Sequence, residues 1–187
     1  EMKKSIRCSG WPRIDMWRKE NNFLFQNEVD DILKRHGNFI LFSSDFGYNS
    51  KKIINETLEI VRKTKWKLLY NEYEEIKHTG DKNLKEYNKF LEILEKYDKI
   101  KNCPQIIIRP HPGEDIDAWF DFSKKVSNIK VIYEGEISPW INASSGLLHR
   151  GCTSAIQAHM QGLPIAYFVT DKSNIVYQTP YDISKKL

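Results

Sequence analysis

A histidine stands between two prolines, directly after a run of isoleucines. The stretch Arg109-Pro110-His111-Pro112 follows Ile106–Ile108. Prolines stiffen a loop and remove backbone donors, so the His111 imidazole is held where the apolar run ends. An imidazole there can donate a hydrogen bond to a phosphate oxygen or protonate a leaving group near neutral pH. The alternative is a histidine that only bonds to the backbone of its own loop, and His-Pro taken alone favours that alternative.

A glycine followed by small hydroxyl residues forms the second candidate element. Gly151 permits a tight turn from a strand into a helix, and Thr153 and Ser154 add hydroxyl donors to the free backbone N–H groups of a helix start. This composition suits a phosphate site. Simple N-capping by Thr or Ser explains the same residues equally well.

Cys152 lies inside this element and could be an activated thiolate at the helix end. The sequence argues against that role, because it indicates no partner base apart from nearby His149. A metal site formed by His149, Cys152 and His159 is less favoured still.

Carboxylates end a third apolar run at Glu134-Gly135-Glu136. A carboxylate at a strand end could accept hydrogen bonds from ribose hydroxyls or from backbone donors, and simple solvation in a loop is the alternative. Ser138-Pro139-Trp140 reads as an N-cap, a first helical turn and a packed aromatic residue. Glu114 and Asp115 are expected at a helix start, where carboxylates complement the helix dipole. Trp119 is expected in the core.

The elements that must position these residues alternate between apolar runs and segments with helical spacing. The runs Gln105–Arg109, Ile129–Tyr133 and Gly146–His149 predict strands, and each stops at one of the polar loops above. This alternation predicts an α/β fold with a parallel sheet flanked by helices. Ligands of such open sheets bind at the carboxyl ends of the strands, which is where the candidate residues lie.

Outside this region the pattern predicts two more strands and several helices. Strands are expected at Phe39–Ser43, followed by a polar loop with Asp45, and at Ile165–Val169, with no helix closing the chain. One helix is expected over Met16–His36, with Trp17, Phe23, Phe25, Val29, Ile32 and Leu33 on one face. Residues 50–101 predict helices packed on the sheet, one around Ile53–Val61 and one over Leu84–Tyr97 after a break at Thr79-Gly80-Asp81.

Composition limits the broad class. The 187 residues suffice for one domain, and the net charge of +4 is spread over mixed Lys and Glu. That mixture predicts a solvated surface and gives no support for nucleic-acid binding. Three scattered cysteines and the lack of a long apolar run predict a cytoplasmic protein, with peripheral association with the inner membrane face left open.

Several of these motifs occur together, in an order that carries a resemblance. They are Gly10-x-Pro12-Arg13-Ile14-Asp15, Phe39-Ile40-Leu41, Ile108–Pro112, Trp119, Tyr133-Glu134-Gly135, Pro139-Trp140-Ile141 and His149-x-Gly151-Cys152-Thr153-Ser154. The set resembles the bacterial surface-carbohydrate biosynthesis proteins, which are glycosyltransferase-like and have the two-domain GT-B architecture. The His-Pro pair followed by a Ser/Thr helix start is also similar to bacterial sialyltransferases and capsule Kdo transferases.

The resemblance implies a Rossmann-like donor-binding domain over residues 39–187, the C-terminal half of a GT-B enzyme. Residues 1–38 would form an interdomain segment and a leading helix, and an N-terminal acceptor domain would be absent. The fragment alone would then be inactive, exposing an apolar surface around Trp11 and Trp17. No metal or other cofactor is implied.

The implied substrate is a nucleotide-linked sugar, transferred to a glycan or lipid-linked acceptor. A CMP-linked Kdo or nonulosonate sugar is favoured, because one helix start suits a single phosphate. The alternatives are a UDP-sugar, a CDP-polyol phosphotransferase of the teichoic-acid type, or nucleotide-sugar binding without turnover.

In this interpretation Gly151, Cys152, Thr153 and Ser154 hold the phosphate, His111 assists its departure, and Glu134 or Glu136 holds ribose. Arg109, Pro112, Gly135 and His149 complete the expected site. Two residues depart from the family pattern. Asp45 replaces an expected Asn and could supply a base or nucleophile, and Gln157 replaces an expected Glu in the substrate site.

Overall fold

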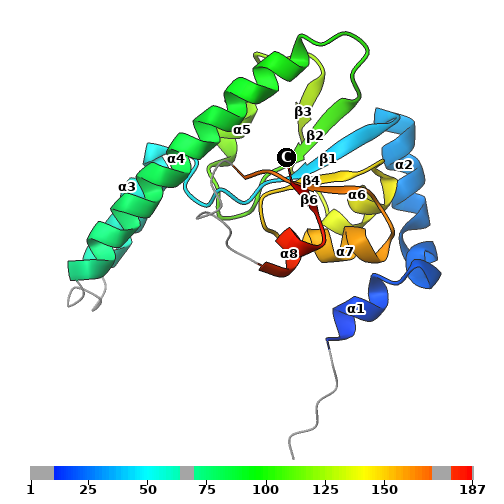
Figure 1. Cartoon of the computed structure of the whole chain (residues 1–187), viewed down its shortest axis with the longest axis horizontal. Helices are drawn as coiled ribbons and strands as arrows, with labels where there is room; N and C mark the ends of the chain where they lie inside the picture. Colours follow the sequence, from blue (N-terminus) through cyan, green and yellow to red (C-terminus); the bar gives the residue numbers. More distant parts are fainter. Residues whose placement is uncertain (1–10, 64–69, 170–177, 187) are drawn as a thin grey trace, which may run out of the picture.

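Six short strands form one sheet in the computed structural model, which describes residues 11–63, 70–169 and 178–186 (Figure 1). Every adjacent pair runs parallel, in the order β3-β2-β1-β4-β5-β6. The strands are β1 (Phe39–Ser43), β2 (Gln105–Arg109), β3 (Ile129–Val131), β4 (Leu147–His149), β5 (Ile165–Tyr167) and β6 (Lys185–Lys186). The parallel α/β prediction is confirmed, although β3, β4 and β5 are shorter than expected.

In this strand order the chain builds the sheet outward from β1 in both directions. The chain moves outward from β1 to β2 and β3, and then returns to the other side of β1 for β4, β5 and β6. This is the order of doubly wound, Rossmann-like folds, whose ligands bind where the direction reverses. The junction between β1 and β4 is therefore the expected ligand position.

Two apolar layers cover the sheet, because successive residues of a strand point to opposite faces. Phe39 and Leu41 of β1 face one layer, together with α2 (Gln26–His36), α6 (Ile137–Ala143) and α7 (Ser154–Met160). Phe42 faces the other layer, against α4 (Tyr70–Asp98) and α5 (Ile116–Ser123). Trp119 lies fully buried in this second layer, as predicted.

A long helical hairpin, α3 (Lys51–Lys63) and α4, extends beyond the sheet (Figure 1). Only the C-terminal half of α4 packs on the sheet, through Tyr87, Phe90 and Leu94. The predicted break at Thr79-Gly80-Asp81 is wrong, because α4 is continuous there. A Cβ on Gly80 would lie 2.9 Å from Cγ1 of Ile54, so this glycine permits close contact between the two helices and does not form a turn.

The single helix predicted over Met16–His36 is also wrong. The segment forms α1 (Pro12–Met16), a 3₁₀ helix η1 (Lys19–Phe25) and α2. A continuous helix would pair the Trp17 carbonyl with the backbone N–H of Asn21. Instead Gln161 Nε2 donates to that carbonyl at 2.6 Å, and the Asn21 N–H donates to Arg18 at 2.9 Å. Trp17 is consequently buried, whereas Phe23 is 68% exposed.

The end of the chain contains elements that the pattern did not predict. A short helix, α8 (Gln178–Asp182), precedes β6, which pairs with β5. Among the helices of the described ranges, none combines the length and the apolar character needed to cross a membrane.

The contact between α3 and α4 predicts an unusual response to an alanine substitution. Gly→Ala in an exposed helix normally stabilises by up to about 1 kcal/mol. We expect Gly80→Ala to destabilise by about 1–3 kcal/mol in urea unfolding, because its Cβ overlaps Ile54. In an Ile54→Ala background the same change should stabilise the protein. Equal effects in both backgrounds would contradict the close contact.

Candidate functional site

A cavity of about 520 Å³ lies where the carboxyl ends of β1, β2 and β4 meet the loop after β3. It therefore occupies the position that the strand order predicts for a ligand. Its walls come from four loops of the sheet, from α7, and from the N-terminal segment. The lining residues are Arg13, Trp17, Ser43, Ser44, Arg109, Pro110, His111, Pro112, Tyr133, Glu134, Gly135, Glu136, Ile137, Ser138, Cys152, Thr153, Ser154 and Gln157.

Most residues proposed from the sequence meet in this cavity, and three do not. Asp45, His149 and Gly151 are absent from its lining. The residues brought together are Arg109, His111, Pro112, Glu134, Gly135, Glu136, Cys152, Thr153, Ser154 and Gln157.

The His111 ring is oriented by its own loop. Its Nδ1 accepts a hydrogen bond from the Gly113 N–H at 3.1 Å, so in the neutral ring the proton lies on Nε2. The backbone-bonding role considered for this histidine is therefore realised, and the ring lines the cavity as well. Its Nε2–H can donate to an anionic oxygen.

Glu114 holds the His111 loop against the loop after β1. Its buried carboxylate accepts from Ser44 Oγ at 2.5 Å, from the Phe46 N–H at 2.5 Å, from Trp119 Nε1 at 2.8 Å and from the His111 N–H at 3.3 Å. Burial raises the pKa of Glu114, and these four donors oppose part of the increase. The prediction that Glu114 serves the helix start is wrong, because its partners join two loops.

Asp115 occupies the N-cap position of α5 but makes no side-chain capping bond. Its carboxylate instead accepts from Ser50 Oγ at 2.7 Å, and its N–H donates to Asn49 Oδ1 at 2.7 Å. Both acidic residues therefore fix the loop after β1. The sequence offered one signal, since two adjacent carboxylates exceed what one N-cap position requires.

Arg109 holds the loop after β3, which forms one wall of the cavity. It is buried, donates to the backbone carbonyls of Glu134 and Gly135, and lies 5.2 Å from the centroid of the Trp140 ring. Burial lowers its pKa from the ordinary value. Two of the five N–H donors of Arg109 are bonded to the loop after β3, which fixes its orientation and makes it less available to a second phosphate.

The two carboxylates of that loop have different partners. Glu134 pairs with Arg35 at 2.8 Å, and this hydrogen bond lowers its pKa. Glu136 is the N-cap of α6 and accepts from the Ser138 N–H at 3.0 Å. The prediction of Ser138 as N-cap is therefore wrong, whereas the packed position of Trp140 is confirmed.

The start of α7 leaves a hydroxyl available to the cavity. Thr153 stands at the N-cap position without a side-chain capping bond, so the capping explanation does not account for it. The Cys152 thiol lies 3.2 Å from Ser43 Oγ and also bonds with Ser154 Oγ. Burial raises the pKa of Cys152, which favours the thiol over the activated thiolate.

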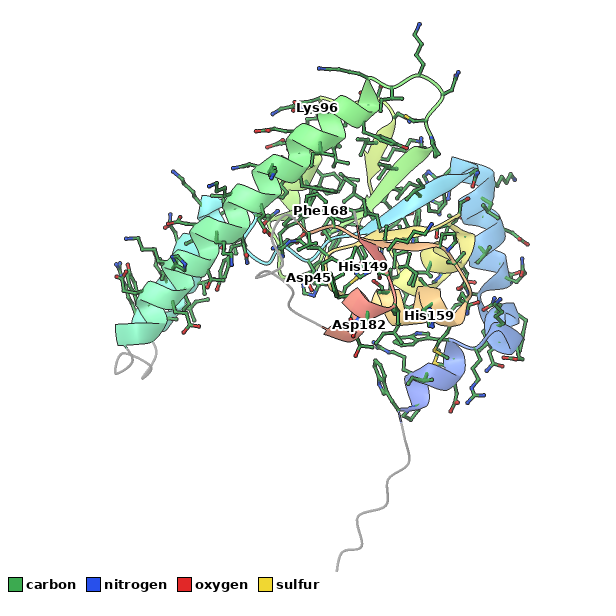
Figure 2. The ribbon with its side chains drawn as sticks, viewed as in Figure 1. Asp45, Lys96, His149, His159, Phe168 and Asp182 are labelled. Atoms are coloured by element: carbon green, nitrogen blue, oxygen red, sulfur yellow. The ribbon has the colours of Figure 1, made fainter. Side chains whose placement is uncertain are left out.

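His149 supports the turn before α7 from inside the protein (Figure 2). It is fully buried, and its Nδ1 accepts from the Gly151 N–H at 3.0 Å, where Gly151 has φ 108°. Its Nε2 lies 2.8 Å from Ser184 Oγ, which donates to the Pro180 carbonyl at 2.6 Å, so Nε2 carries the proton. Desolvation lowers the pKa of His149 to about 4. His149 thus positions the turn and does not face a ligand.

A buried ion pair that the sequence pattern did not reveal supports the loop of Asp45. Arg150 bonds with Glu86 of α4 and donates to the Asp45 carbonyl at 2.9 Å. Its guanidinium lies 4.8 Å from the Phe46 ring centroid. Burial raises the pKa of the Asp45 carboxyl, and a positive charge on His111, when its ring is protonated, and on Arg150 opposes the increase. The pair thereby links the helical hairpin to the edge of the cavity.

A second hollow of about 560 Å³ adjoins the cavity. The two share Arg13, Trp17, Ser138 and the Glu134–Glu136 loop, so a bound molecule has room to extend from one to the other. Apolar side chains dominate the part that is not shared, including Met16, Phe25 and Trp140.

Metal ligands do not gather anywhere in the described ranges, where no group of three His, Cys, Asp or Glu side chains is placed to hold an ion. Comparisons of the chain with protein-family models, with curated proteins and with solved structures found no match.

The buried neutral His149 predicts a loss of stability in mild acid. Its pKa is about 4 in the folded protein and ordinarily 6.5, so between these values the unfolded chain binds more protons. His149 therefore weakens the fold as the pH falls from 6.5 towards 4, by up to about 3 kcal/mol. Urea unfolding of wild type and His149→Gln should be measured at several pH values. The unfolding free energy of the variant should change less between pH 6.5 and pH 4 than that of wild type. The same pH dependence of the unfolding free energy in wild type and variant would exclude a buried neutral histidine.

Proposed function

We propose that this chain is the donor-binding domain of a GT-B glycosyltransferase in bacterial surface polysaccharide biosynthesis. It would hold a nucleotide-linked sugar in the cavity and present the sugar to a glycan or lipid-linked acceptor. The observation that carries the proposal is the convergence of the His111 imidazole with Thr153 and Ser154 beside the β1–β4 junction. Donors of this kind suit a phosphate.

The chemistry we propose is electrostatic stabilisation of the departing nucleotide phosphate. Negative charge builds on that phosphate as the glycosidic bond breaks, and donors fixed in advance stabilise it without reorganising. While Nδ1 of His111 accepts from Gly113, its Nε2–H serves as a neutral hydrogen-bond donor. This geometry favours stabilisation of the leaving group by His111 over proton transfer to it.

The balance of charge favours a ligand with one phosphate. Two arginines, Arg13 and Arg109, and two glutamates, Glu134 and Glu136, line the cavity, and their formal charges cancel. Lysine is absent from the described lining, and Arg109 already donates to two backbone carbonyls. We favour a CMP-linked sugar of the Kdo or nonulosonate kind over UDP- or GDP-linked sugars, because its nucleotide has one phosphate and its second negative charge is a carboxylate on the sugar. The sugar would lie where the cavity and the adjoining hollow share Arg13 and the Glu134–Glu136 loop.

The donor class can be tested by calorimetric titration of the chain with CMP and UDP. We expect CMP to bind more tightly, because Arg109 is already bonded to two backbone carbonyls and Arg13 is the one other cation of the described lining. A tenfold preference for UDP, about 1.4 kcal/mol, would overturn the CMP proposal. A thermal-shift screen that adds CDP and GDP would then identify the preferred nucleotide.

The proposed role of His111 predicts that replacing it weakens the binding of nucleotides that carry a phosphate and leaves the binding of the nucleoside unchanged. His111→Ala should weaken CMP binding by about 10- to 100-fold, the range for one hydrogen bond to a charged group. Binding of cytidine, which lacks the phosphate, should be unchanged. His159→Ala, at an exposed position on α7, is the matched control. Equal losses for CMP and cytidine would show that His111 only maintains the loop.

A further inference from the structure

Gln157 and Ser44 are the most deeply buried polar side chains in the cavity lining, each with 1% of its surface exposed. In the structure Gln157 Oε1 faces Ser138 Oγ at 3.2 Å, and Gln157 Nε2 is buried without a hydrogen-bond partner among the described residues. A buried donor without a partner is rare in folded proteins, whereas an incompletely bonded carbonyl oxygen is less so. The two ends of an amide have nearly the same shape, so their partners decide which end is which.

The hydroxyl proton of Ser138 decides which end of the Gln157 amide faces Ser138. Ser138 Oγ also lies 2.9 Å from Glu136 Oε1, and a hydroxyl has only one proton to donate. The carboxylate is the stronger acceptor, because a hydrogen bond to an ionised group is charge-assisted. Without that proton between them, the two oxygens would repel each other. Ser138 therefore donates to Glu136 and must accept from Gln157.

Only the amide nitrogen of Gln157 can donate to Ser138. The amide is therefore turned by half a rotation, with Nε2 towards Ser138 Oγ and the carbonyl oxygen at the buried, unpartnered position. We infer that Glu136, acting through Ser138, fixes Gln157 as a hydrogen-bond acceptor for a hydroxyl or amino group of the ligand. Gln157 is then a specificity-determining residue, and Glu136 and Ser138 are positioning residues.

This inference rests on the proposed function only in naming the ligand. A nucleoside monophosphate offers two sources of a neutral donor, the ribose hydroxyls and, in CMP, the base amine. An acceptor left unpaired in a buried site costs about 1–3 kcal/mol, so a ligand that lacks the donor should bind about 5- to 100-fold more weakly.

The orientation can be tested first in the free protein by nuclear magnetic resonance. Gln157 side-chain N–H protons directed at Ser138 should give a nuclear Overhauser effect to the Ser138 side chain. Ser138→Ala should shift the Gln157 amide resonances, whereas His159→Gln on the same helix should not. No Overhauser effect from an assigned Gln157 amide to Ser138 would overturn the inference.

The acceptor role can then be tested by titrating CMP, 2′-deoxy-CMP, 3′-deoxy-CMP and UMP into wild type and Gln157→Met. Wild type should bind at least one analogue 5- to 100-fold more weakly than CMP, the range set by one unpaired acceptor. Gln157→Met, of similar length and without the acceptor, should abolish that difference while retaining the others. The deoxy analogues identify a hydroxyl as the donor, and UMP identifies the amine.

The outcomes separate the two proposals. Ser138→Ala should reduce the same discrimination, because the amide is then free to turn. Discrimination that persists unchanged in Gln157→Met excludes Gln157 as the acceptor. If the Overhauser effect is present and none of the four nucleotides binds, the proposed function fails while the orientation of Gln157 stands.

Discussion

The buried Glu114 carboxylate accepts hydrogen bonds from the loop after β1, the loop after β2 and α5. Without it, the donors of Ser44, Phe46, His111 and Trp119 would lose this acceptor, and each buried donor left unpaired costs about 1–3 kcal/mol. The two loops therefore hold one arrangement relative to each other. The position of the His111 ring over the cavity follows from that constraint.

Other buried polar groups hold the remaining walls in the same way. Arg109 binds the carbonyls of the loop after β3, His149 accepts from the turn before α7, and Arg150 joins the loop after β1 to Glu86 of α4. Each of these side chains is held by hydrogen bonds within the protein. They consequently build a cavity whose donors are oriented before a ligand arrives, which is the arrangement that electrostatic stabilisation of a leaving group requires.

The same commitments set the character of the cavity. With Arg109 and Glu136 engaged inside the protein, the groups left to a ligand include Arg13 and three neutral groups, the His111 Nε2–H, the Thr153 hydroxyl and the Gln157 amide. A ligand with one phosphate and several hydroxyl or amino donors matches this set. The helical hairpin also stabilises the loop after β1, because Arg150 bonds with both Glu86 of α4 and the Asp45 carbonyl of that loop.

The sequence by itself determined the parallel α/β fold, the strands β1 and β2, and the meeting of His111 with Thr153 and Ser154. Apolar periodicity and the turn residues are local properties, and parallel strands bring their carboxyl ends to one edge. Tertiary contacts decided the rest. Gly80 indicated a helix break in the sequence, but in the structure it permits close contact with Ile54. The helix predicted through Trp17 is interrupted there, because Gln161 donates to the Trp17 carbonyl. Whether His149 faces a ligand or Ser184, and which groups Glu114 joins, depends on partners distant in sequence that no local pattern encodes.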